Sequence, residues 1–119
     1  MTWEYSQSTG ELKHNGGIFA HGYSGRGEGK NNPQSENVED VGPIPKGYYR
    51  INGYNNHKGP LTVILEPIAG TNTYGRSAFR IHGYNSATMG NSSKGCIVIN
   101  GAHLRQNILN SGDTVLVVR

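Results

Sequence analysis

The chain has 119 residues, which is enough for one domain with a modest core, and only 34% of them are hydrophobic. The net charge of +3 comes from 11 basic and 8 acidic residues scattered along the sequence, so a binding stripe for nucleic acid is not expected. The single cysteine cannot form an internal disulfide, and no apolar stretch approaches the roughly 18 residues of a membrane span.

Glycine occupies 18 positions, and so many turns in a short chain indicate short strands and a mostly β fold. The first residues lack the basic and apolar regions of a signal peptide, so we expect synthesis in the cytoplasm without one. Residues 1–7 are predicted to form a short strand with Trp3 and Tyr5 on one face, because strand side chains alternate.

A hairpin is predicted next, from Glu11–His14 to Ile18–Tyr23. Asn15-Gly16 between the two strands supplies the positive φ angles that a tight turn needs. Ser24–Asp40 is polar and has no periodicity, which predicts a long loop of the kind that often carries function.

The remaining elements are five strands and one helix. Each predicted strand is an apolar or alternating run bounded by turn residues. These strands cover Tyr48–Tyr54, Leu61–Glu66, Ala78–His82, Cys96–Ile99 and Asp113–Val118. The predicted helix is Gly101–Asn110, with Asn100 as its N-cap and Gly112 at its end, and with Leu104 and Ile108 on its buried side. The sequence therefore predicts a single mostly β domain over residues 1–119, a small antiparallel sandwich or barrel-like fold with one helix in its C-terminal half.

Cys96 is the first candidate for chemistry. A lone cysteine is usually an inert core residue, but this one lies where a polar loop turns into an apolar strand. Gly95 would let a substrate carbonyl approach the backbone, where the N–H groups of Gly95 and Cys96 could bind an oxyanion. Lys94 adds positive charge beside the thiol, which favours the thiolate and rapid alkylation at about pH 6 to 7.

His82 is the candidate base for Cys96. A strand, a loop and a returning strand can bring the two side chains to the same edge of a sheet, and a thiol needs such a base or a nearby cation near neutral pH. Arg80 projects from the same strand face as His82, and its guanidinium could bind a substrate carboxylate through two hydrogen bonds.

Three segments carry a resemblance to a known family. His82-Gly83 and Ser93–Ile97 resemble the signature of the L,D-transpeptidase (YkuD-like) catalytic domain, and Pro45–Tyr49 resembles the strand entry of those domains. The likeness covers nearly the whole chain and is more specific to compact, signal-less L,D-transpeptidase-like toxins delivered by bacterial type VI secretion. Larger members often have histidine and arginine where this chain has Lys94 and Val98, so the balance between ligation and hydrolysis stays open.

The resemblance implies a peptidoglycan stem peptide as substrate. Cys96 would attack the carbonyl on the L-centre of the third stem residue and release the terminal D-alanine. The acyl-enzyme would then pass to water (L,D-carboxypeptidase), to a D-amino acid (exchange) or to an amine (L,D-transpeptidase). No metal or organic cofactor is needed for this chemistry.

The other implied residues surround the pair formed by Cys96 and His82. Positioning or oxyanion roles fall to Gly95, Ser93 and Gly83, and substrate contacts fall to Arg80, Lys94, Tyr23 and Ser24. The protein would work as a monomer in the periplasm of a target bacterium, and an immunity protein would be its partner in the producing cell.

Two alternatives remain. The first is a non-catalytic β domain that binds cell-wall polymer, with Cys96 as a core residue. The second is another cysteine amidase, although papain-like enzymes usually place the cysteine before the histidine. The other histidines lack metal-ligand spacing, and the carboxylates that could be drawn as a glycosidase pair are interpreted as solvated loop charges; these carboxylates are Glu36, Glu39 and Asp40.

Overall fold

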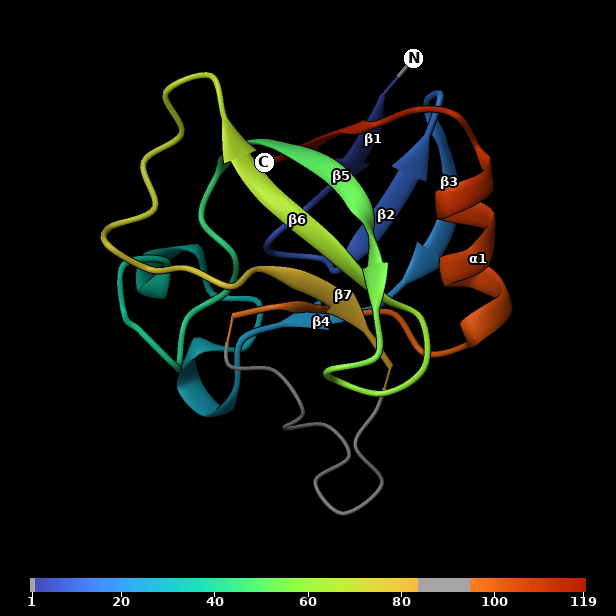
Figure 1. Cartoon of the computed structure of the whole chain (residues 1–119). Coiled ribbons are helices and arrows are strands. Elements are labelled where there is room, and N and C mark those ends of the chain that lie inside the picture. The colour runs from blue at the N-terminus through green and yellow to red at the C-terminus, as the bar shows by residue number, and fades with distance from the viewer. Residues whose placement is uncertain (1, 84–94) are drawn as a thin grey trace.

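The computed structural model describes residues 2–83 and 95–119. These residues form one sheet of nine strands with a single α-helix, so the fold is mostly β, as predicted (Figure 1). The strands are β1 Trp3–Tyr5, β2 Glu11–His14, β3 Gly17–His21, β4 Tyr23–Ser24, β5 Gly47–Asn55, β6 Thr62–Ile68, β7 Arg80–His82, β8 Ile97–Val98 and β9 Val115–Val118. The helix is α1 Ala102–Asn110, and two 3-10 turns are η1 Gly27–Gly29 and η2 Pro33–Ser35.

The sheet curls round on itself. Its strand order is β3-β2-β1-β9-β5-β6-β7-β8-β4, and the two outermost strands, β3 and β4, are separated in the chain by Gly22 alone. A Cβ atom at Gly22 would lie 1.9 Å from the carbonyl oxygen of Val98 in β8. Only glycine lets the backbone pass this close, so Gly22 closes the sheet into a barrel-like shape.

The predicted N-terminal hairpin is confirmed. β2 and β3 pair antiparallel, and the turn between them has positive φ angles of 53° at Asn15 and 85° at Gly16. These angles match the tight turn that Asn-Gly favours, in which both central residues are left-handed.

The prediction of an antiparallel sheet is correct for most strand pairs but wrong for two. β1 pairs parallel with β9, and β7 pairs parallel with β8 in the register Ile81↔Ile97 and His82↔Val98. The chain between β7 and β8 is long enough for the crossover that parallel strands require. The parallel register places Ile81 and Ile97 side by side in the core.

Helix α1 begins one residue later than predicted. Its N-cap is Gly101, with a φ of 114° and no side-chain capping hydrogen bond, so the prediction of Asn100 as the cap is wrong. The buried side is as predicted, because Ile108 is buried and Leu104 packs against the core. With nine residues α1 is too short to cross a membrane, and no helix long enough occurs within residues 2–83 and 95–119.

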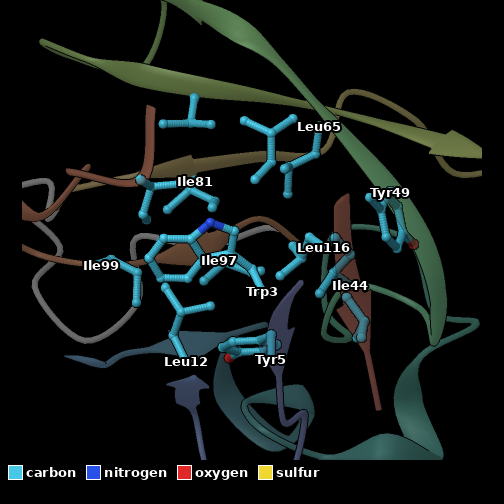
Figure 2. Packing of buried hydrophobic residues seen from close by; sticks show 14 of the residues in the cluster. Trp3, Tyr5, Leu12, Ile44, Tyr49, Leu65, Ile81, Ile97, Ile99 and Leu116 are labelled. Atoms are coloured by element: carbon cyan, nitrogen blue, oxygen red, sulfur yellow. The ribbon is translucent and has the colours of Figure 1, made fainter. Parts of the chain in front are cut away.

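The core lies inside the curled sheet. Figure 2 shows Tyr49 and Leu65 from β5 and β6 facing Tyr5 and Leu12 from β1 and β2. Trp3 and Tyr5 are both 1% exposed, which confirms the shared buried face predicted for the first strand.

The predicted long loop between β4 and β5 is held in place by a carboxylate. Glu36 accepts hydrogen bonds from the Gln7 amide at 3.0 Å, the Lys46 backbone N–H at 2.9 Å and the Tyr74 hydroxyl at 3.3 Å. The interpretation of Glu36 as a solvated charge is therefore wrong, because three donors from separate segments meet at this half-buried side chain.

Candidate active site

The outer face of β7 and β8 carries the candidate catalytic residues. Ile81 and Ile97 belong to the core, so strand alternation turns their neighbours outward. His82 is 5% exposed and Cys96 is 8% exposed, yet Cys96 lies outside the core cluster. Both side chains are therefore buried on the face of the sheet opposite the core.

The parallel register makes Cys96 and His82 diagonal neighbours. Cys96 precedes Ile97, which pairs with Ile81, so it lies alongside Arg80. His82 lies two residues farther along the neighbouring strand and on the same face. The two side chains are therefore placed on one face of neighbouring strands.

Burial controls the thiol of Cys96. Its Sγ donates to the carbonyl oxygen of Ala78 at 3.6 Å. Burial raises the pKa of Cys96, while the backbone N–H of Arg80 and the charges of Arg80, Lys58 and Arg76 lower that pKa. Burial is the larger effect, so the resting group is a protonated thiol at neutral pH.

The ring of His82 is oriented by its own neighbour. Its Nδ1 lies 2.8 Å from the carbonyl oxygen of Gly83, and a carbonyl only accepts, so Nδ1 carries the proton and Nε2 has the lone pair. Burial lowers the pKa of His82, the bond to Gly83 raises it, and the charges of Lys58, Arg105 and Arg80 lower it further. The imidazole is therefore neutral near pH 7 and can accept a proton from a thiol.

Among the described residues, the charges named as acting on the pKa values of this pair are cations. Arg80 and Lys58 influence both side chains, Arg76 influences Cys96, and Arg105 influences His82. Lys58 lies in the turn between β5 and β6, at the end of the β5–β6 hairpin nearest the end of β7 (Figure 1). This electrostatic setting favours an anionic ligand.

The structure shows why position 95 holds a glycine, which the sequence alone did not reveal. Its φ is 122°, and a Cβ atom there would lie 2.1 Å from Nη2 of Arg76. The space that the missing side chain leaves is taken by a guanidinium, so the expectation that it admits a substrate carbonyl is not supported on that side of Gly95.

The structure brings some of the other predicted residues to the site. Tyr23 pairs with Val98 and so shares the outer face with Cys96. Ser24 is fully buried, and its hydroxyl accepts from the N–H of Ile44 at 2.8 Å and donates to the carbonyl of Gly95 at 3.4 Å. These contacts fit a role for Ser24 in positioning Gly95. Ser93 and Lys94 lie outside the described residues.

Three residues near the site were missed by sequence reasoning. Arg105 lies three residues before the buried Ile108, so helical periodicity could have placed it on the buried side. Lys58 lies in the β5–β6 turn, and its place near the site could be predicted only if the order of the strands in the sheet were known. Arg76 lies in an aperiodic loop and gave no signal.

Two of the other histidines, His14 and His21, have partners of their own. His14 stacks on Trp3 with ring centroids 4.0 Å apart, and its Nε2 lies 2.7 Å from Asp113. His21 is exposed and lies 3.7 Å from Glu11. In the part of the chain that the structure describes, no three His, Cys, Asp or Glu side chains are grouped as metal ligands would be.

The fold and the site define a small barrel-like β domain with a cysteine and a histidine buried on one outer face. A family model, the Tlde1 domain, matches residues 19–118, so the chain belongs to the Tlde1 domain family, a family of type VI secretion effectors. The match includes both His82 and Cys96, and it identifies the chain as an effector domain of the toxin class. No curated protein and no solved structure matches the chain significantly.

Proposed function

We propose that this domain is a cysteine-dependent acyl-transfer enzyme that acts on peptidoglycan stem peptides, as an L,D-transpeptidase or L,D-carboxypeptidase. The observation that carries the proposal is the shared outer face of β7 and β8, where Cys96 and His82 are diagonal neighbours. The hydrogen bond from Nδ1 of His82 to the carbonyl of Gly83 supports the proposal, because this bond leaves Nε2 as the basic nitrogen. An effector of the toxin class that cuts or rebuilds stem peptides would weaken the wall of a target cell.

The reaction would begin with proton transfer. Nε2 of His82 takes the proton from Sγ of Cys96 as the sulfur attacks the carbonyl carbon of the third stem residue. Backbone N–H groups at Gly95 and Cys96 would stabilise the oxyanion. The C–N bond then breaks, His82 returns the proton to the leaving amine of D-alanine, and a thioester remains on Cys96. Water, a D-amino acid or the amine of another stem would resolve the thioester.

Substrate recognition would rely on the cations around the pair. A stem tetrapeptide carries a carboxylate on diaminopimelate and another on its terminal D-alanine. Nε of Arg80 is buried and has no hydrogen-bond partner in the described structure, so it is a donor suited to such an anion. Tyr23, buried on the same face, and Lys94 complete the proposed set of contacts.

As a type VI effector, the domain would act in the periplasm of the target bacterium. A producing cell would then need an immunity protein. The simplest inhibitor would cover the face that carries Cys96 and His82, because it would block the substrate without unfolding the toxin.

Trapping the acyl-enzyme tests the proposal. A synthetic stem tetrapeptide is mixed with the protein, the reaction is quenched in acid, and the intact mass is measured. We expect an adduct on Cys96 that equals the tetrapeptide minus D-alanine, since the thioester forms as the amine leaves. His82→Gln should lose the adduct, whereas His103→Gln, which changes an exposed histidine, should keep it. A domain that binds cell-wall polymer without release of D-alanine or an adduct would contradict the proposal.

A further inference from the structure

Two buried arginines flank the candidate site. Arg76 is 6% exposed and Arg105 is 5% exposed, although each carries a full charge. Each guanidinium donates to three backbone carbonyls. For Arg76 the acceptors are Glu36, Gly42 at 3.0 Å and Pro43 at 2.8 Å, and for Arg105 they are Pro60 at 2.9 Å, Leu61 at 2.9 Å and Ile99 at 2.6 Å.

Each arginine also lies against the glycine that neighbours a candidate catalytic residue. A Cβ atom at Gly95, which precedes Cys96, would lie 2.1 Å from Nη2 of Arg76. A Cβ atom at Gly83, which follows His82, would lie 2.9 Å from Nη1 of Arg105. The two guanidinium groups therefore occupy matching places behind the two halves of the site.

The carbonyl acceptors fix each guanidinium group against neighbouring segments of the chain. Arg76, which lies between β6 and β7, is bonded to the loop before β5, and Arg105 bonds α1 to the β5–β6 turn and to Ile99, directly after β8. Burying a charge is costly, and the planar fork of arginine recovers part of that cost by serving several acceptors at fixed angles. Lysine has the charge but lacks the fork.

We infer that Arg76 and Arg105 are positioning residues, Arg76 for the Gly95-Cys96 backbone and Arg105 for His82-Gly83. The inference rests on the proposed function only in taking Cys96 and His82 as the reacting pair.

The two arginines also act on the pKa values of the site, Arg76 on that of Cys96 and Arg105 on that of His82. Burial is the largest effect on the pKa of Cys96 and raises it. The charge of Arg76 lowers that pKa, as do the charges of Arg80 and Lys58. Burial is the main cause that lowers the pKa of His82, and the hydrogen bond to Gly83 opposes it. The charge of Arg105 lowers the pKa further, as do the charges of Lys58 and Arg80.

Four variants separate charge from position: Arg76→Lys, Arg76→Gln, Arg105→Lys and Arg105→Gln, with the exposed Arg50→Gln as the matched control. Two readouts need no substrate: the rate of Cys96 alkylation by iodoacetamide against pH, and the NMR titration of the His82 ring. Thermal unfolding of each variant shows what fraction is folded at the assay temperature, and turnover is corrected for that fraction.

We expect Arg76→Gln to raise the pKa of the thiol and to leave the His82 titration nearly unchanged. Arg105→Gln should raise the pKa of His82 and leave the thiol nearly unchanged. The lysine variants should keep both pKa values close to wild type, yet all four variants should lose stem-peptide turnover by about tenfold or more, as loss of a charge-assisted hydrogen bond does.

A further variant tests the contact without removing a donor. Gly83→Ala places a methyl group where Arg105 lies, so it should lower turnover in wild type and have a smaller effect in the Arg105→Lys background. Lysine variants with wild-type turnover, or glutamine variants that move neither pKa, would overturn the inference. If the wild type itself never turns over stem peptides while the substrate-free readouts respond as expected, the proposed function fails and the positioning roles remain.

Discussion

At the scale of single residues, burial decides the chemistry of the site. It raises the pKa of Cys96 and lowers the pKa of His82, so both groups are neutral near pH 7. The structure thus supports a thiol that is deprotonated as it attacks. The sequence had suggested a preformed thiolate that alkylates fast at about pH 6 to 7, and the burial of Cys96 removes the physical basis for that expectation.

The pH dependence of alkylation tests this point. The rate of reaction of Cys96 with iodoacetamide should be slow at about pH 6 to 7 and should rise with pH to beyond the ordinary pKa of a thiol, because only the thiolate reacts. Protein unfolded in urea should react faster at pH 7, since its thiol has an ordinary pKa. A fast rate that is already constant from about pH 6 would instead show a stable thiolate–imidazolium pair.

Arg80 should determine substrate choice through charge. The wild type should prefer stem tetrapeptides with a free diaminopimelate carboxylate over stems in which it is amidated, because Nε of Arg80, which has no partner among the described residues, gains a charged acceptor. Arg80→Ala should lose that preference, with a fall of about ten- to hundredfold in kcat/KM for the free acid. Equal rates for both stems in the wild type would remove Arg80 from substrate recognition.

At the scale of elements, local patterns predicted the strands and the helix better than their partners. The Asn15-Gly16 hairpin, the strand with Trp3 and Tyr5 and the helix with Ile108 follow from turn chemistry and alternation, and all are present. The parallel pairing of β7 with β8 was not predicted, because strand direction depends on contacts distant in sequence.

The same limit applies to the site. Cys96 and His82 could be proposed from their residue types and from the likeness to a known signature. Helical periodicity could place Arg105 on the buried side of α1, but the contacts of Arg76 and Arg105 could not be predicted, because their partners are backbone carbonyls that no pattern of side chains records. The sequence shows glycines beside the site, but only the structure shows the guanidinium groups that fill the space beside them.

The role of Gly22 in closing the sheet can be tested through the free energy of unfolding. Gly22→Ala would push a methyl group into the Val98 carbonyl and should lower the free energy of unfolding by about 3 kcal/mol or more. Gly17→Ala is the matched control, since its nearest neighbour would be the carbonyl of His14 at 3.7 Å, and it should cost less than about 1 kcal/mol. Urea unfolding measures both, and equal losses would show that Gly22 does not close the sheet.

At the scale of the whole molecule, the core lies inside the curled sheet and the candidate site lies outside it. Cys96 is buried but does not belong to the core cluster. Replacing its thiol should therefore have little effect on the stability of the fold. His82 is the exception, because burying a neutral imidazole links the protonation of the site to folding.

That link predicts how stability changes with pH. The pKa of His82 is lowered in the folded state, so below about pH 6.5 the unfolded chain binds a proton that the folded protein excludes. The free energy of unfolding should therefore fall as the pH is lowered from about 7 to 5. Urea titrations of His82→Gln should show a smaller fall, and an equal fall in both proteins would mean that His82 is not buried as a neutral ring.

In the proposed function, Cys96 performs acyl transfer on the peptidoglycan stem, and the products of intact peptidoglycan test this directly. Purified peptidoglycan is incubated with wild type or with Cys96→Ala, whose fold should survive because the thiol lies outside the core, and the released fragments are measured by mass. We expect wild type to remove the terminal D-alanine from tetrapeptide stems, to exchange it or to replace it with a cross-link, and we expect Cys96→Ala to do none of these. Identical fragment masses with both proteins, or wild-type turnover by folded Cys96→Ala, would contradict the proposed function.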